Sequence, residues 1–211
     1  MSAVARHTGW ISPEEYLVGE HTSEVRHEYV NGHVYAMAGA SDDHNRIVGN
    51  IHGELRERLR GKRCEPFMAD MKVKIPPTFE DIYYYPDVIV VCDPADDAKY
   101  YRERPSVILE VLSPESERTD RREKAIVYRL IPGLEVYVLV EQDRMAATVL
   151  RRAEPGWQSE ILAGAGAILK LENIGVSIPL ERLYERTAVV GANRSTSART
   201  GETLDQSLSK A

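Results

Sequence analysis

The chain has 211 residues, of which 43% are hydrophobic, and a formal net charge of -6 at pH 7. This length allows one sizeable core, and no run approaches the roughly 18 uncharged apolar residues of a membrane span, so we expect a soluble, cytoplasmic protein with a single domain over residues 1–186. The acidic balance argues against a protein that binds nucleic acid with its whole surface, because contacts to phosphate depend on lysine and arginine.

Two local signals mark the N-terminal part of the chain. The order Ser-Pro-Glu-Glu at residues 12–15 combines a cap, a first-turn proline and a glutamate three residues after the cap, which predicts a short helix. The dipeptide Asn31-Gly32 lies between two strand-like segments and most readily takes the two positive φ angles of a type I′ turn. We therefore expect a helix followed by a β-hairpin.

An amphipathic helix is predicted next, with Ser41 or Asp42 as its cap and Gly61 at its end. Its apolar side chains recur at every fourth position, namely at Ile47, Ile51, Leu55 and Leu59. Serine is a favoured N-cap and glycine a favoured residue just beyond a helix end, so both boundaries agree with the periodicity. One stripe of this helix should face a core.

Strand-like runs then occupy residues 64–75, 86–92 and 106–112. The second and third runs are apolar on both faces, which is typical of central strands covered by helices on both sides. The second cover is expected at about residues 120–131, with an inward stripe formed by Ile126, Val127, Leu130 and Ile131.

The C-terminal part changes character. Three runs, 135–141, 146–152 and 157–162, predict antiparallel hairpins. Residues 187–211 contain no aromatic residue and predict a flexible tail. The two cysteines, Cys64 and Cys92, are too few for a disulfide framework and stand outside any Cys-x-x-Cys pattern, so we expect small core residues.

Two carboxylates interrupt the apolar runs. Asp87 follows a proline at the opening of one strand, and Glu110 lies between apolar neighbours in the middle of another. Burying a charged side chain costs several kcal/mol unless it is paired or holds a metal, so this placement indicates a site. If the two strands are adjacent, the carboxylates can converge.

Such a pair suits Mg²⁺ or Mn²⁺, which bind carboxylate oxygens and fill their remaining positions with water and substrate oxygens. A metal at this place would polarise a phosphoryl oxygen and activate water, which is the chemistry of phosphodiester hydrolysis. Lys124 lies one turn before Tyr128 on the predicted second cover helix, and its long stem could carry the ammonium inward.

These segments together resemble a known family. The segments are Tyr-Pro-Asp at 85–87, Glu-Val-Leu-Ser-Pro at 110–114, Asp-Arg-Arg-Glu-Lys at 120–124 and Arg-His-Glu-Tyr-Val-Asn-Gly-His-Val-Tyr at 26–35. They are similar to the Uma2 (DUF820) family of predicted endonucleases, in the PD-(D/E)XK nuclease superfamily, over roughly residues 11–184.

The resemblance implies an α/β (α+β) fold of the restriction-endonuclease-like type: a mixed β-sheet flanked by helices, here with an N-terminal hairpin and a C-terminal antiparallel extension. It also implies that Asp87 and Glu110 are catalytic metal ligands. The superfamily pattern has a lysine two residues after the glutamate, where this chain has Leu112, so the catalytic lysine is expected on the following helix, at Lys124.

Other polar residues have weaker signals. Glu28 could add a carboxylate to the metal site, and His44 could face a phosphate from the start of its helix, although such residues are more often solvated or capping groups. Asp70 shares an alternating segment with lysines and could bind nucleic-acid backbone. The three tyrosines at 83–85 could stack on a base, but core packing is the simpler interpretation.

Three functions remain open from sequence. The first is a DNA endonuclease that depends on Mg²⁺ or Mn²⁺, and the second is an inactive nuclease fold that binds nucleic acid or a protein partner. The third is a glycosidase that uses the two carboxylates as acid and base without a metal. Because strand edges in the antiparallel extension need covering, we also expect a homodimer.

Overall fold

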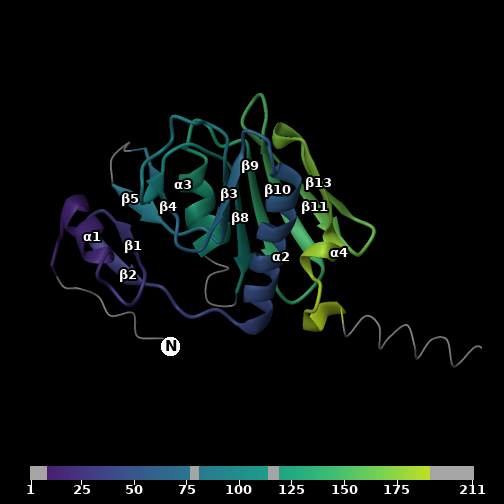
Figure 1. The fold of residues 1–211 in the computed structure, drawn as a ribbon, viewed down its shortest axis with the longest axis horizontal. Helices are drawn as coiled ribbons and strands as arrows, with labels where there is room; N and C mark the ends of the chain where they lie inside the picture. Colours follow the sequence, from purple (N-terminus) through teal and green to yellow (C-terminus); the bar gives the residue numbers. More distant parts are fainter. Residues whose placement is uncertain (1–8, 77–80, 114–118, 191–211) are drawn as a thin grey trace, which may run out of the picture.

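The computed structural model describes residues 9–76, 81–113 and 119–190. Its centre is a six-stranded mixed sheet in the order β11-β10-β9-β8-β6-β3, in which the β8–β9 pair is parallel and the other pairs are antiparallel. The strands are β3 (Glu65–Met68), β6 (Val88–Val91), β8 (Pro105–Leu112), β9 (Val136–Glu141), β10 (Ala146–Arg152) and β11 (Trp157–Ala163). The predicted mixed sheet with a C-terminal antiparallel extension is therefore present (Figure 1).

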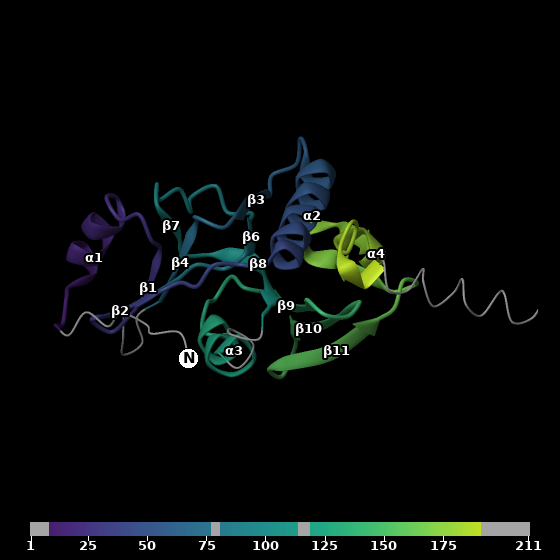
Figure 2. The same cartoon turned by 90° about the horizontal axis from the view of Figure 1, so that it is seen from below.

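Helices cover both faces of this sheet. Helix α2 (Asp42–Leu59) lies over one face, and a π-helical turn (Thr119–Lys124) continues into α3 (Ala125–Tyr128) over the other (Figure 2). On β8, the odd-numbered residues 107, 109 and 111 belong to the core that α2 covers, whereas Ile108 and Leu112 belong to the core with α3. The two-residue alternation therefore places Glu110 on the α3 side.

The N-terminal residues form a second sheet with the order β2-β1-β5-β4-β7. Its strands are β1 (His27–Val30), β2 (His33–Ala36), β4 (Lys72–Ile75), β5 (Ile82–Tyr84) and β7 (Tyr101–Arg102), and helix α1 (Pro13–Glu20) precedes them. The predicted hairpin is confirmed, with φ of 46° at Asn31 and 85° at Gly32. The predicted capping box of α1 is also confirmed, because Ser12 and Glu15 bond each other's backbone N–H groups.

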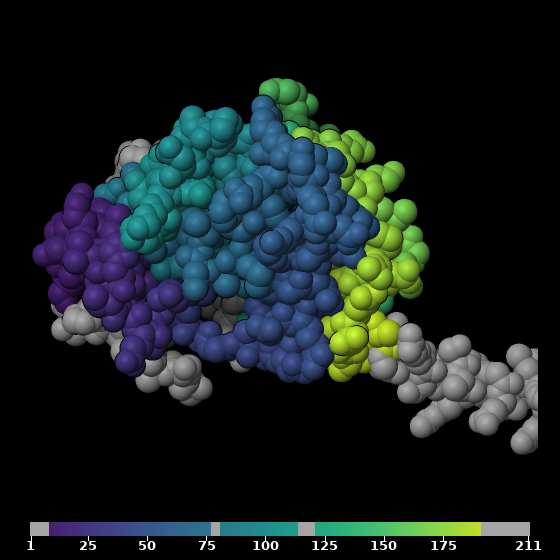
Figure 3. All heavy atoms as spheres, viewed as in Figure 1, coloured from purple at the N-terminus to yellow at the C-terminus, as the bar shows by residue number. Residues whose placement is uncertain are grey.

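The end of the described chain forms a small layer beside α2, in the same core between α2 and the sheet. It contains β12 (Ile168–Leu171), a 3₁₀ turn (Glu172–Ile174), β13 (Val176–Pro179) and α4 (Leu180–Leu183). Residues 187–190 extend this layer, since Thr187 is buried and the Ala188 N–H donates to the carboxylate of Asp43 at 3.2 Å. In the space-filling view this segment lies against the first turns of α2 (Figure 3). The predicted tail beyond residue 190 lies outside the described residues, and the domain boundary at 186 stays a prediction.

Two sequence predictions are wrong in detail. Residues 64–75 do not form one strand: the chain turns at Ala69, whose φ is 55°, so β3 joins the central sheet and β4 the other sheet. The predicted helix stripe is also wrong at two of its four residues: Ile131 is buried and Val127 packs against the core, but Ile126 is 65% exposed and Leu130 46% exposed. Lys124 and Tyr128 are buried in their place. This segment is rotated so that the polar side chain of Lys124 faces inward.

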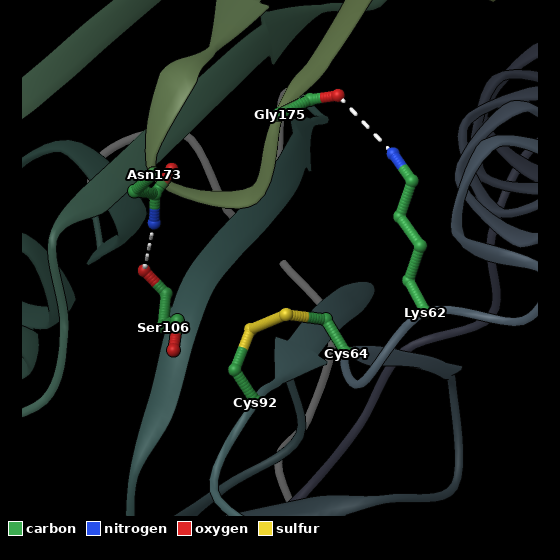
Figure 4. The surroundings of a disulfide bond; sticks show 6 residues. All are labelled: Lys62, Cys64, Cys92, Ser106, Asn173 and Gly175. Carbon is green, nitrogen blue, oxygen red and sulfur yellow. Dashed lines mark hydrogen bonds between the residues drawn. A yellow bond between two sulfur atoms is a disulfide. The ribbon is translucent and has the colours of Figure 1, made fainter.

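The cysteines are also not free core residues. Cys64 and Cys92 form a disulfide that joins the start of β3 to the end of β6, two strands paired in the register Glu65 to Val91 (Figure 4). Around it, Lys62, between α2 and β3, donates to the Gly175 carbonyl, and Asn173 donates to the carbonyl of Ser106 in β8. These bonds join the C-terminal layer to the rest of the fold. Within the described residues, no helix is long and apolar enough to cross a membrane.

Candidate active site

Asp87, directly before β6, and Glu110, on the adjacent strand β8, lie side by side. Strands β6 and β8 pair antiparallel with Val88 opposite Leu109, so the next pair in register is Asp87 and Glu110. The Asp87 N–H donates to Glu110 Oε2 at 3.0 Å, and the Val111 N–H donates to Asp87 Oδ2 at 2.7 Å. The convergence expected from sequence is present, and the backbone fixes both carboxylates.

The side chain of Lys124 reaches these carboxylates from the π-helical turn that covers this face of the sheet. Its ammonium lies 3.4 Å from Glu110 Oε1 and 2.9 Å from Glu28 Oε1, and the residue is only 7% exposed. A buried ammonium is tolerated when carboxylates compensate its charge, which is why this turn directs a lysine inward while Ile126 faces solvent. The ring of Tyr84 also lies 5.3 Å from the ammonium.

Glu110 has a further partner that the sequence analysis did not assign. The Tyr128 hydroxyl donates to Glu110 Oε1 at 3.0 Å, and Tyr128 is fully buried. Tyr128 follows Lys124 by four residues, so both side chains lie on one face of the helical segment. That spacing was a usable signal, because a lysine and a tyrosine together on a buried face indicate a polar partner.

Two other predicted residues complete the group. Glu28, in β1, accepts from Lys124 and from the Tyr85 N–H at 3.5 Å. His44 lies in the first turn of α2, next to the cap Ser41, and its Nε2 is 3.3 Å from Asp87 Oδ2. Asp87, Glu110, Lys124, Glu28 and His44 are therefore joined by direct contacts, although they come from five separate elements.

The remaining sequence candidates lie elsewhere. Asp70 is exposed and pairs with Arg26 at 3.0 Å on the surface. The tyrosines at 83–85 are all buried, as the core interpretation predicted. Tyr83 packs in a ring cluster with Tyr16 and Tyr29, so it offers no exposed platform for a base.

A second buried polar group supports the site from the N-terminal sheet. The Tyr85 hydroxyl donates to Glu20 at 2.8 Å and accepts from Lys72 at 3.0 Å, and His27 also contacts Glu20 at 2.9 Å. Burial, reinforced by the Glu20 carboxylate, raises the pKa of Tyr85, and burial lowers the pKa of Lys72. Because these residues are scattered from 20 to 85, no local pattern predicted this group.

The carboxylates of this group are possible ligands for a divalent metal. Among the described residues, no group of three or more His, Cys, Asp or Glu side chains is arranged to hold an ion. The two carboxylates nevertheless fit Mg²⁺ or Mn²⁺, which often take one or two protein carboxylates and otherwise bind water and substrate. Asp87 Oδ1 has no hydrogen-bond donor among the residues described, and its side chain is 22% exposed, so one oxygen is available to an ion.

Comparison with known proteins gives consistent results. A family model described as "Uma2: Putative restriction endonuclease" matches residues 13–181. The chain is 34% identical over 179 residues to "Uncharacterized protein slr1290" of Synechocystis sp. (strain ATCC 27184 / PCC 6803 / Kazusa), covering 84% of this chain and 93% of that one. It is 33% identical over 135 residues to "Uncharacterized protein sll1609" of the same organism, covering 63% and 75%.

One solved structure is similar in fold. It is described as a "putative nuclease belonging to DUF820" from Anabaena variabilis ATCC 29413, and it superposes with a TM-score of 0.63 at 16% identity. The match covers 77% of this chain and 91% of that one. At this identity the likeness concerns the fold alone, and it confirms the predicted mixed α/β architecture.

Proposed function

The chain belongs to the Uma2 family of restriction-endonuclease-like proteins, and on this basis we propose that it is a metal-dependent endonuclease that hydrolyses phosphodiester bonds of DNA. The observation that supports this most is the meeting of Asp87, Glu110 and Lys124 at one point between two central strands and a helical turn. Hydrolysis of a phosphate ester needs oxygen ligands for a hard cation and a fixed positive charge beside the reacting phosphate. This group of side chains offers both.

Asp87 and Glu110 would hold the Mg²⁺ or Mn²⁺ ion. When bound, such an ion supplies Lewis acidity toward a phosphoryl oxygen and activates water as the nucleophile. The protein's own contribution is preorganisation. Each carboxylate accepts a backbone N–H from the strand of the other, so their relative position is set by sheet pairing rather than by flexible side chains.

Lys124 supplies the fixed positive charge. Additional negative charge develops on the phosphoryl oxygens as the bond breaks, so an immobile ammonium stabilises the transition state more than the bound substrate. Glu28 also contacts the ammonium, and we assign it the role of orienting Lys124. We assign His44 a corresponding role toward Asp87, which it contacts through Nε2.

A second candidate function is an inactive nuclease fold that binds nucleic acid or a protein partner. One observation favours it: both oxygens of Glu110 already accept bonds from protein donors, since Lys124 and Tyr128 contact Oε1 and the Asp87 N–H contacts Oε2. A carboxylate so well satisfied gains less from an ion than a poorly paired one. Active and inactive forms must therefore be distinguished by assay.

The test is cleavage of supercoiled plasmid DNA by the purified full-length protein with Mg²⁺ or Mn²⁺. We expect nicking that EDTA abolishes and that Asp87→Asn and Glu110→Gln each reduce by roughly a hundredfold or more. Asp70→Asn is the matched control, because it makes the same chemical change at an exposed aspartate away from the site. Binding of DNA without nicking under either metal would favour the inactive alternative, and cleavage that persists in EDTA would contradict a metal-dependent mechanism.

We further propose a homodimer. Strand β11 is an edge of the central sheet, seven residues long and largely exposed, and Ile161 on it is 75% exposed. An uncovered edge of this kind is open to pairing with another strand. Light scattering should give twice the chain mass at micromolar concentration, and a monomer mass throughout that range would exclude this assembly.

A further inference from the structure

A second row of charges lies beside the proposed catalytic group. Glu141 is the last residue of β9 and is 7% exposed, and Arg121 and Arg144 both contact its Oε1. In the parallel β8–β9 pair, Glu110 is opposite Leu139 and Leu112 is opposite Glu141. Glu141 therefore lies on the same face as Glu110, one strand across and two residues further along, at about 8 Å from standard strand dimensions.

One turn of the chain provides the cations for both carboxylates. The π-helical turn Thr119–Lys124 carries Lys124, which contacts Glu110, and Arg121, which contacts Glu141. The two differ in access to solvent, since the side chain of Lys124 is 8% exposed and that of Arg121 is 30% exposed. Arg121 is thus the solvent-accessible cation on the sheet face that carries Glu110 and Glu141, and it is on the same turn as Lys124.

Glu141 does not depend on Arg121 alone. Removing one partner of a buried ion pair is costly when it leaves the other charge uncompensated. Here the guanidinium of Arg144 also contacts Glu141 Oε1, at 2.8 Å, so a second cation is beside this carboxylate when Arg121 moves away. Because Glu141 is shared by two arginines, the free-energy cost of moving Arg121 to another partner is smaller than it would be for an isolated buried ion pair.

We infer that Arg121 binds a backbone phosphate of the nucleic acid adjacent to the phosphate at Asp87 and Glu110, moving from Glu141 to that phosphate when a strand is bound. This inference rests on the proposed function for the position of the strand. A guanidinium suits this role because its planar fork donates two parallel hydrogen bonds to phosphate oxygens. The substrate it implies is a polynucleotide with a phosphate on the β9 side of the cleaved bond, rather than a mononucleotide ester.

The test measures binding without cleavage. Fluorescence anisotropy of a labelled DNA duplex and of a labelled single strand, in EDTA, is followed from about 50 to 200 mM salt. We expect Arg121→Gln to weaken binding about tenfold and to lower the slope of log affinity against log salt by about one, as for the loss of one phosphate contact. Arg122→Gln is the matched control, since it removes the same charge from the next, exposed residue, and it should change affinity less than about twofold.

Glu141→Gln separates a phosphate contact from a structural ion pair. If the Arg121–Glu141 pair only stabilises the turn, both substitutions should weaken binding alike. If Arg121 binds phosphate, Glu141→Gln removes the competing carboxylate and should tighten binding. Circular dichroism and thermal melting of each variant confirm that the fold is retained.

A small substrate gives an independent measurement. Bis(p-nitrophenyl) phosphate has no neighbouring phosphate, so Arg121→Gln should raise KM for DNA about tenfold and raise KM for this small diester much less. Equal weakening by Arg121→Gln and Arg122→Gln, no effect of Arg121→Gln, or no binding of DNA by the wild type would each overturn the inference. Selective weakening by Arg121→Gln without cleavage under any metal would support it while contradicting the endonuclease proposal.

Discussion

Lys124→Met is the substitution that tests the buried charge group most directly. The change keeps an unbranched side chain of similar size but removes the ammonium that contacts Glu28 and Glu110. Removing one partner of a buried ion pair typically costs about 3–5 kcal/mol, because the other charge is left uncompensated. Glu110 is 3% exposed and so bears this cost, whereas the side chain of Glu28 is 17% exposed and is partly solvated, which favours the lower end.

We therefore expect Lys124→Met to lower the free energy of unfolding by about 3 kcal/mol, which for a domain of this size is a decrease in Tm of roughly 6–12 °C. The measurement is urea unfolding at neutral pH, followed by circular dichroism. Lys170→Met makes the same change at an exposed strand position and should alter stability by less than about 0.5 kcal/mol.

The double variant Glu110→Gln/Lys124→Met provides the decisive comparison. With the buried carboxylate neutralised, most of the loss caused by Lys124→Met should be recovered, giving a favourable coupling energy on the order of 2 kcal/mol. Cleavage should be lost in both variants, so recovered stability with absent activity would assign the pair to function. A loss below about 1 kcal/mol for Lys124→Met, or no recovery in the double variant, would refute the charge compensation described above.

Three further outcomes are expected. Tyr128→Phe removes a hydroxyl that donates to Glu110 at 3.0 Å, so it should cost about 1.5 kcal/mol in urea unfolding; a neutral result would contradict the bond. Reduction of the Cys64–Cys92 disulfide, which spans 28 residues, should cost about 3.5 kcal/mol by loop closure, and unchanged unfolding in dithiothreitol would contradict this. Burial raises the pKa of a group of core tyrosines: Tyr16, Tyr83, Tyr85 and Tyr184. What these tyrosines contribute to the free energy of unfolding is complete below about pH 10. Above that pH the unfolded chain releases protons that the folded chain retains, so the free energy of unfolding falls by up to about 1.4 kcal/mol per pH unit for each tyrosine. Tyr83→Phe should reduce the slope of the free energy of unfolding against pH, measured by denaturant unfolding at about pH 9 and 11, by up to the contribution of one tyrosine. An unchanged slope would contradict a raised pKa of Tyr83.

Local signals predicted the fold well where the structure is decided locally. The helix start at Ser41 or Asp42, the Asn31-Gly32 turn and the alternation around Glu110 each depend on residues close in sequence. All three are confirmed, with Ser41 as the cap. The division of residues 64–75 at Ala69 was not predictable in this way. Nothing in that segment marks a strand change, which depends on two different sheets accepting its halves.

The candidate site shows the same distinction. The apolar periodicity predicted that Ile126 faces the core and that Lys124 lies at the edge of the apolar stripe, because a periodicity argument considers only the polarity of each side chain. The structure places Lys124 inside because Glu28 and Glu110, which are distant in sequence, compensate its charge. The pairing of Cys64 with Cys92 is likewise a consequence of β3 lying beside β6, which spacing along the chain does not reveal.

The position of the lysine follows from the core around Glu110. Leu112, where the superfamily pattern has its lysine, shares a face with Glu110, is 4% exposed, and belongs to the apolar cluster that includes Ile108 and Tyr137. Leu112 packs in that cluster and supplies no cation. The π-helical turn instead brings Lys124 over the same face, where its ammonium contacts Glu28 and Glu110. A cation can therefore reach the carboxylate of one strand from a neighbouring element, and the spatial arrangement of charges, rather than the spacing Glu-x-Lys, is what the proposed chemistry requires.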